Sequence, residues 1–323
     1  MEEKKERVRL YVVRDFGQKL SATTDFLRAN WKVLLKYLTY FLLPISLIQA
    51  LGLNGFMDGY ITSLQGITAG HGGNDDFSMI MSFAIGLLSY VGLAMVGGLL
   101  LESALYAIIR FHDENEKDLA LIEWIDIKKY FWQGIRRLLV LMLIGFGLLA
   151  IFFLFVGLLA VVMGETGIIL GVIGFYLIMF IAIIALAPFF VLVSPTYIFQ
   201  DDLNVLTAIK KSFRYSFSTW GGTWAIILVL GFLTNIVSGI TTTPWYVAEM
   251  VKMFLGISDS EAGAFADSYI YSFILYLLAV VQCFGNYLVS LILYIGFAYC
   301  YGHAAEKLDG VTMDSNIRNF QSL

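Results

Sequence analysis

Charged side chains are scarce in this sequence. Asp, Glu, Lys and Arg make up 14% of its 323 residues, hydrophobic residues make up 59%, and the mean hydropathy is +0.78. Soluble domains are nearer a quarter charged and half apolar. The composition therefore excludes an ordinary soluble domain and predicts a chain that folds in a lipid bilayer. The net charge of −4 also argues against a nucleic-acid partner.

Cysteine and histidine are scarce too: the sequence has two cysteines and three histidines. Cys283 and Cys300 lie in one apolar run, several helical turns apart if that run is one helix, so we expect them to be unpaired. The string His112-Asp113-x-x-Glu116 imitates a metal cluster, but a single histidine in an acidic loop is usually only solvated. Motifs for a nucleophile, a zinc site or a phosphate loop are missing. We therefore expect no enzyme activity, no catalytic residue, no metal and no cofactor.

Long apolar runs predict an all-α polytopic membrane protein with six transmembrane helices arranged as three hairpins. The runs lie at about residues 31–53, 79–110, 138–163, 167–192, 223–243 and 269–301. Gly52 to Phe77 is rich in Gly, Asp and Asn, so we expect a loop there. Pro44 and Pro188 lie inside spans and should kink them. The last run exceeds one crossing, which favours one tilted or protruding helix over a helix broken at Gly285.

Amphipathic segments precede two of these runs. In Asp201–Trp224, and again in Leu121–Leu138, apolar residues recur at intervals of 3, 3, 4, 4 and 3, while basic residues occupy the other face. We therefore predict interfacial helices before spans three and five, and a similar one before span one. Asp201 or Asp202 is placed to cap the helix before span five.

The recurring pattern predicts a single membrane domain, 1–323, with internal repeats. The repeats cover about residues 16–110, 121–200 and 201–305, followed by a cytoplasmic tail at 306–323. Each repeat would be an interfacial helix followed by a two-span hairpin.

Basic residues lie on one predicted side. Of 21 lysines and arginines, 20 fall in the terminal segments and in the loops after spans two and four. Lys252 is the exception, on a side that carries eight acids. Positively charged segments stay cytoplasmic, so both termini are predicted to be cytoplasmic.

Three groups of residues resemble a known family. They are Phe26-Leu27-Arg28-x-Asn30-Trp31 with Pro44; Pro195 with Asp201-Asp202 and Ala208-Ile209-Lys210-Lys211-Ser212-Phe213; and Tyr301 with Glu306-Lys307-x-Asp309-Gly310. The chain resembles the six-span membrane domain found in bacterial glycerophosphoryl diester phosphodiesterases and in stand-alone membrane proteins of unknown function. The resemblance implies a bacterial cytoplasmic (inner) membrane location. It does not carry over the phosphodiesterase activity, which belongs to a separate soluble domain for which this chain has no room.

Four polar residues fall within spans, namely Glu102, Asn235, Gln282 and Asn286. The three amides either form hydrogen bonds that lock helices together or line a cavity for a polar headgroup or solute. Glu102 either belongs to such a site or lies at the inner headgroups near Arg110, at the end of a long second span. Seven basic residues of the interfacial helices would attract anionic headgroups or only orient the helices: Lys128, Lys129, Arg136, Arg137, Lys210, Lys211 and Arg214.

These observations favour a non-enzymatic membrane module that organises lipids or a partner protein. The alternative is a transporter or channel for a lipid or small amphiphile, and an intramembrane enzyme ranks third. Membrane lipids are the expected partners. A second membrane protein or a cytosolic protein is the alternative partner.

Overall fold

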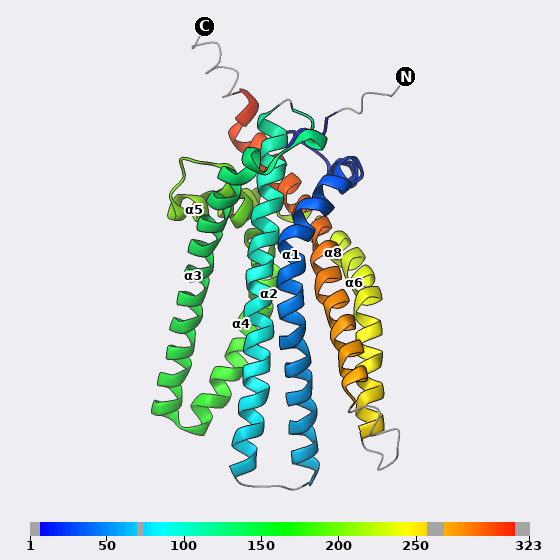
Figure 1. Cartoon of the computed structure of the whole chain (residues 1–323). Coiled ribbons are helices and arrows are strands. Elements are labelled where there is room, and N and C mark those ends of the chain that lie inside the picture. Colours follow the sequence, from blue (N-terminus) through cyan, green and yellow to red (C-terminus); the bar gives the residue numbers. More distant parts are fainter. Residues whose placement is uncertain (1–6, 70–73, 116, 257–267, 314–323) are drawn as a thin grey trace. The chain divides into compact units, whose positions relative to one another are not determined.

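The computed structural model describes residues 7–69, 74–115, 117–256 and 268–313 (Figure 1). Within these ranges every regular element is helical. The long helices are α1 (Phe16–Ala69), α2 (Asn74–Glu114), α3 (Trp124–Met163), α4 (Glu165–Phe199), α6 (Trp220–Gly256) and α8 (Tyr269–Asp309). The short ones are η1 (Leu119–Leu121) and α5 (Val205–Ser218).

Five of these helices are long and apolar enough to cross a membrane, and α4 is a sixth if its two segments count as one span. The all-helical, membrane-type fold predicted from composition is thereby confirmed. The two segments of α4, 169–181 and 184–199, are bent by 65°. Pro188 follows the bend by one turn, and in a straight helix its ring would clash with the carbonyl of Ile184, so the predicted kink in this helix is also confirmed.

The described helices gather into two compact units. Unit 1 comprises Met1–Asn30, Leu105–Leu230 and Tyr294–Leu323, and unit 2 comprises Trp31–Ala104 and Gly231–Leu293. Aromatic side chains fill the interior of unit 1, where Tyr106, Tyr215, Tyr299, Tyr301 and Phe26 are fully buried. A smaller apolar cluster around Trp245 and Cys283 lies in unit 2. Both cysteines are buried and unpaired, as expected. The division of the chain into three repeats stays a prediction.

The loop predicted from Gly52 to Phe77 was wrong over most of its length, because α1 continues to Ala69 and α2 begins at Asn74; residues 70–73 lie outside the described residues. The glycines of this stretch allow two helices of unit 2 to touch. A Cβ on Gly59 would lie 2.8 Å from the Phe83 backbone, and one on Gly86 would lie 2.6 Å from the Phe56 backbone. Glycine therefore marks close helix approach here rather than a turn.

The interfacial helix predicted before span three is not a helix of its own but the first part of the span helix, and its position at an interface stays a prediction. Residues 124–163 form one uninterrupted helix, α3, since the chain between Ile135 and Ile144 has no glycine or proline to break it. The predicted spacing nevertheless holds in its first turns, where Ile127, Phe131 and Leu138 are buried. The amphipathic segment at 16–30 is likewise part of α1 rather than a separate helix.

Before span five the predicted separate helix is confirmed, as α5, but its predicted cap is not. Its N-cap is Asn204, and neither aspartate caps it. Its apolar residues Leu206 and Phe217 are 69% and 64% exposed, while small and hydroxyl residues face the protein. An apolar face left open beside membrane-type helices is the arrangement that an interfacial helix has toward lipid.

Helix α8 runs without a break through Gly285, so the one-helix reading of the last apolar run is confirmed. Gly285 lies against α6, because a Cβ there would be 2.7 Å from the Thr241 side chain. In Figure 1, α6 and α8 run side by side, and the hydrogen bond from the Tyr271 hydroxyl to the Ala248 carbonyl agrees with this.

Two glycine-to-alanine substitutions in α2 test the close approach of the helices. Gly86→Ala would place a methyl group against immovable backbone, and such overpacking costs roughly 1–3 kcal/mol. Gly92 has open space around its Cα, so Gly92→Ala should be neutral or stabilising, since alanine favours helix by about 1 kcal/mol. We expect a lower melting temperature in detergent for Gly86→Ala only. Equal melting temperatures for both variants would contradict the close helix approach.

Candidate functional site

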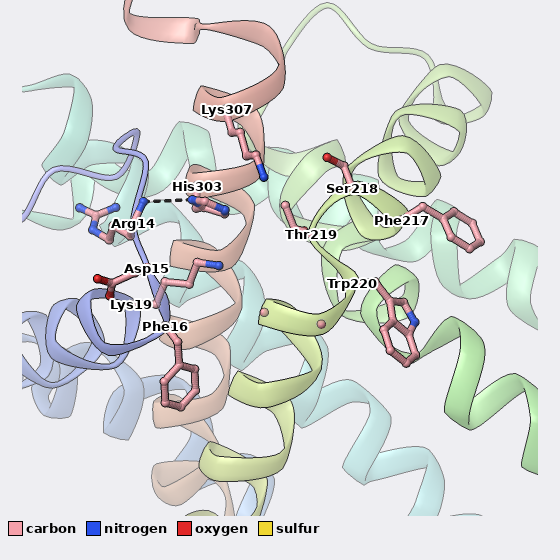
Figure 2. Close-up of a pocket in the computed structure, with 12 residues that line it drawn as sticks. Arg14, Asp15, Phe16, Lys19, Phe217, Ser218, Thr219, Trp220, His303 and Lys307 are labelled. Atoms are coloured by element: carbon pink, nitrogen blue, oxygen red, sulfur yellow. Dashed lines mark hydrogen bonds between the residues drawn. The ribbon is translucent and has the colours of Figure 1, made fainter.

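A cavity of about 370 Å³ opens in unit 1 between the start of α1, the junction of α5 with α6, and the end of α8 (Figure 2). Its lining combines basic groups, glycines and aromatic rings. The lining residues are Arg14, Asp15, Phe16, Lys19, Phe217, Ser218, Thr219, Trp220, Gly221, Gly222, His303 and Lys307. We call this cavity the basic pocket.

Arg14 holds one wall of the basic pocket in place. Its guanidinium donates to the backbone carbonyls of Leu10, at 2.9 Å, and of Arg9, and it lies over the Tyr299 ring. Its backbone N–H donates to Nδ1 of His303 at 3.0 Å. Because Nδ1 accepts this bond, the imidazole proton is on Nε2, which remains a donor. Arg14 is therefore a structural residue that orients His303.

The first turn of α1 brings Lys19 into the pocket. Asp15 and Gln18 form a reciprocal cap: the Gln18 N–H donates to Asp15 Oδ1 at 2.7 Å, and the Asp15 N–H donates to Gln18 Oε1 at 3.1 Å. One residue later, Lys19 is only 3% exposed. Within the described part of the chain, its ammonium forms no hydrogen bond or ion pair. The ammonium is not among the buried atoms that lack a partner, so solvent or an anion in the pocket can reach it.

The junction of α5 with α6 forms the opposite wall. Thr219 ends α5, with its N–H bonded to the Tyr215 carbonyl, and α6 begins at Trp220 with two glycines following. The first backbone N–H groups of a helix have no acceptor within it. Because Gly222 lacks a side chain, the Lys19 ammonium approaches this first turn: a Cβ on Gly222 would lie 3.4 Å from Nζ.

Two tryptophans attach the start of α6 to α4. Trp224 Nε1 donates to the Ile184 carbonyl at 2.7 Å, and Trp220 Nε1 donates to the Ala185 carbonyl at 3.1 Å. Pro188 has no N–H, so it leaves the Ile184 carbonyl, four residues earlier, without its helical donor. The tryptophans of the string WGGTW thus satisfy carbonyls at the bend of α4 and position the first turn of α6.

The electrostatics of the basic pocket favour an anion. The side chains of Lys19, His303 and Lys307 point from α1 and α8 toward the α6 start (Figure 2). The N-terminal end of a helix carries a partial positive charge, and its free N–H groups bind phosphate and carboxylate. Asp15 is the acid among the described lining residues, and one of its oxygens is engaged by Gln18. A positive site with a buried lysine results.

A second polar cluster in unit 1 surrounds Asp201. The Arg110 guanidinium donates to both carboxylate oxygens, at 2.8 and 2.5 Å, and to Glu114 at 2.6 Å. Gln133 donates to the same carboxylate. Arg137 donates to the backbone carbonyls of Gln200 and Asp201 at 2.7 and 2.6 Å. The Arg137 guanidinium thus binds backbone carbonyls just after the end of α4 that have no donor within the helix. A cation is favourable at this end of a helix.

A third cluster ties α5 to α8 through Asp309. Lys211 lies 2.6 Å and Arg214 3.3 Å from the Asp309 carboxylate, and the Tyr215 hydroxyl donates to it at 2.7 Å. Gln200 extends this network, because it accepts from Lys211 and donates to the Tyr301 hydroxyl. Lys211 and Asp309, two of the residues that carry the resemblance, thus meet in an ion pair, whereas Asp201 pairs with Arg110 in the cluster described above.

The seven basic residues predicted to contact lipid divide into two groups. Arg137, Lys211 and Arg214 bind carbonyls or carboxylates of the protein. The other four are at least partly exposed: Lys128, Lys129, Arg136 and Lys210. Lipid contact by any of the seven stays a prediction.

The four polar residues predicted near the midplane all lie in unit 2. Asn286 of α8 accepts from Ser238 and, at 3.4 Å, from Thr241 of α6. Asn235 is exposed and donates to the Gly231 carbonyl of its own helix at 2.7 Å. Gln282 is 6% exposed, and its carbonyl oxygen lacks a donor among the described residues. Glu102 is half-buried on α2. One of the four therefore joins α6 to α8, as a helix lock would.

Sequence reasoning missed the basic pocket. Gly221-Gly222 suggests a joint between two helices, but the joint is Thr219 and the two glycines lie in the first turn of α6. The pattern Asp15-x-x-Gln18 marks a capping box. The pocket forms from segments about 200 and 80 residues apart, and no local pattern links them. Comparisons of the chain with protein families, curated proteins and solved structures found no match.

The Asp201 cluster predicts a dependence of stability on pH. Hydrogen bonds from Arg110 lower the pKa of Asp201 to about 2. A depressed carboxyl pKa stabilises the folded state above the unfolded value of about 3.9, and this contribution is lost as the pH falls through the folded pKa.

We expect Asp201→Asn to lower stability at neutral pH by roughly 1 kcal/mol, a value discounted because the Asp201 side chain is 50% exposed. Thermal melts in detergent at neutral and acidic pH measure the effect, and the loss should shrink in acid. The exposed neighbour substitution Asp202→Asn is the control. Equal effects of both substitutions would argue against a specific role of the Arg110–Asp201 pair.

Proposed function

We propose that this protein is a non-enzymatic module of the cytoplasmic membrane that binds anionic lipid headgroups in the basic pocket. It would cross the bilayer six times, as three hairpins, with both termini in the cytoplasm. The distribution of basic residues, 20 of 21 on one side, supports this orientation. The observation that carries the proposal is Lys19, buried beside the first turn of α6 with no partner among the described residues.

A headgroup phosphate suits the donors that surround the pocket. Its oxygens accept hydrogen bonds from an ammonium, from an imidazole Nε2–H and from helix N-terminal amides. Basic pockets between membrane helices on the cytoplasmic side bind such headgroups. Phe16, Phe217 and Trp220 are 40%, 64% and 40% exposed, and exposed aromatic rings of this kind are characteristic of the membrane interface.

The exposed α3–α4 hairpin is also consistent with lipid as the surrounding solvent. The most apolar window of α3 contains no buried residue, and its mean hydropathy is 3.0. Acyl chains would cover this surface in a bilayer. Arg110, Arg137 and Asp201 would then act as a structural clamp at the end of α4 and not as lipid ligands, because their donors and acceptors already bind one another.

Native mass spectrometry of the protein in an uncharged detergent tests the proposal. We expect the protein to retain phosphatidylglycerol over phosphatidylcholine. Lys19→Met should weaken retention about tenfold, since a hydrogen bond to a charged group contributes about 1.5–3 kcal/mol. Gly222→Leu should have a similar effect without a change of charge, because its side chain would enter the pocket beside Lys19.

Lys210→Gln is the matched control, since Lys210 is exposed on α5 and outside the pocket. Equal losses for Lys19→Met and Lys210→Gln would indicate attraction to surface charge and refute a defined headgroup site. Displacement of the lipid by equimolar inorganic phosphate would assign the pocket to a free anion instead. Melting temperatures of all variants establish that they remain folded.

A further inference from the structure

A buried acid in unit 2 lies outside everything described so far. Glu249, on α6, is 1% exposed. Neither of its carboxylate oxygens receives a hydrogen bond from the described residues. Buried polar atoms in folded proteins nearly always have partners, so two orphaned oxygens on one carboxyl group call for an explanation.

Donors are present nearby, but each is bound to another acceptor. One turn before Glu249, Trp245 Nε1 donates to Asn54 Oδ1 at 3.0 Å. The Tyr271 hydroxyl of α8 donates to the Ala248 carbonyl at 2.7 Å. One turn after Glu249, the Lys252 ammonium forms an ion pair with Asp58 of α1 at 2.6 Å. The three donors near Glu249 therefore all bind other acceptors.

An ionised Glu249 in this position would be an uncompensated buried charge. Burying such a charge costs far more than burying a neutral carboxylic acid, although the neutral acid also loses hydrogen bonds to water. The neighbouring ammonium would compensate the charge only if it left Asp58. While Lys252 remains with Asp58, the neutral acid is therefore the form that fits the site.

We propose that Glu249 is a proton-binding site coupled to the Lys252–Asp58 ion pair. In the arrangement seen here, Glu249 carries the proton and Lys252 binds Asp58. In the second arrangement, Lys252 turns to Glu249, which ionises and releases one proton to water. Asp58, whose side chain is 55% exposed, then remains as a solvated carboxylate.

The geometry of α6 permits this exchange. Residues three apart on a helix lie on neighbouring turns, so the Lys252 side chain is within reach of Glu249. Among the described residues, the titratable groups that act on Glu249 are Asp58 from α1 and Lys252 from α6, and Tyr271 of α8 interacts with it in turn. Proton binding would thus be linked to the contact between α1 and α6. This inference is independent of lipid binding in the basic pocket.

Labelling of the intact protein with dicyclohexylcarbodiimide tests the proposal, because this lipid-soluble reagent modifies protonated carboxyl groups in apolar surroundings. We expect peptide mass spectrometry to find the label on Glu249 at neutral pH, with less label as the pH is raised. Glu249→Gln should abolish this label. Asp58 should stay unlabelled because it is exposed to water and paired with Lys252.

Two further variants separate coupling from burial alone. Asp58→Asn frees Lys252 to pair with Glu249, so labelling of Glu249 should fall several-fold. Lys252→Met removes the competing ammonium, so labelling should persist to higher pH than in the unmodified protein. Melting temperatures in detergent identify variants that fail to fold.

Two results would overturn the proposal. One is an unlabelled Glu249 in the folded protein while other carboxyl groups of the same protein take up the reagent. The other is labelling of Glu249 that neither Asp58→Asn nor Lys252→Met changes, because the carboxyl group would then be buried without being coupled to the ion pair.

Discussion

Carbonyl groups of α4 that its own helix cannot bond are taken by side chains from other helices of unit 1. At the bend, Pro188 leaves the Ile184 carbonyl without its helical donor and Trp224 of α6 binds it, while Trp220 donates to the neighbouring Ala185 carbonyl. At the end of α4 the donors are Arg110 of α2, which binds the Ile198 carbonyl, and Arg137 of α3. In surroundings with little water an unpaired carbonyl is costly, so these contacts decide where the neighbouring helices lie.

The basic pocket depends on this arrangement. The two indoles hold the first turn of α6 against α4, and Gly222 in that turn leaves room for the Lys19 ammonium beside it. The capped start of α1 and the His303 ring complete the site from two other helices. Trp220 and Trp224, which bind carbonyls at the bend of α4, therefore also position one wall of the basic pocket. An anionic headgroup is the ligand that such a positively charged cavity would favour.

Unit 2 is built differently. Its helices approach closely at Gly52, Gly59, Gly86 and Gly285, so backbone and side-chain contacts replace a large aromatic core. Polar bonds cross these contacts: Ser238 to Asn286, Trp245 to Asn54, and the Tyr287 hydroxyl to Gln49 at 2.7 Å. Close packing with interhelical hydrogen bonds is typical of helices in lipid, where apolar surface alone does not drive association. Glu249 is the acid that this network leaves unsatisfied.

Composition and periodicity determined the helical, membrane-type fold, the separate helix α5, the bend of α4 and the unbroken α8. These follow from properties that a short stretch of chain carries by itself: the length of an apolar run, the spacing of its polar face, and the missing N–H of a proline. Only the tertiary structure decided that the glycines at 52–59 lie in a helix, that Asp201 binds Arg110 instead of capping α5, and that Lys19 meets the start of α6. Each of these outcomes depends on a partner far away in the sequence, and a glycine, an aspartate or a lysine has the same local pattern whether or not that partner is present.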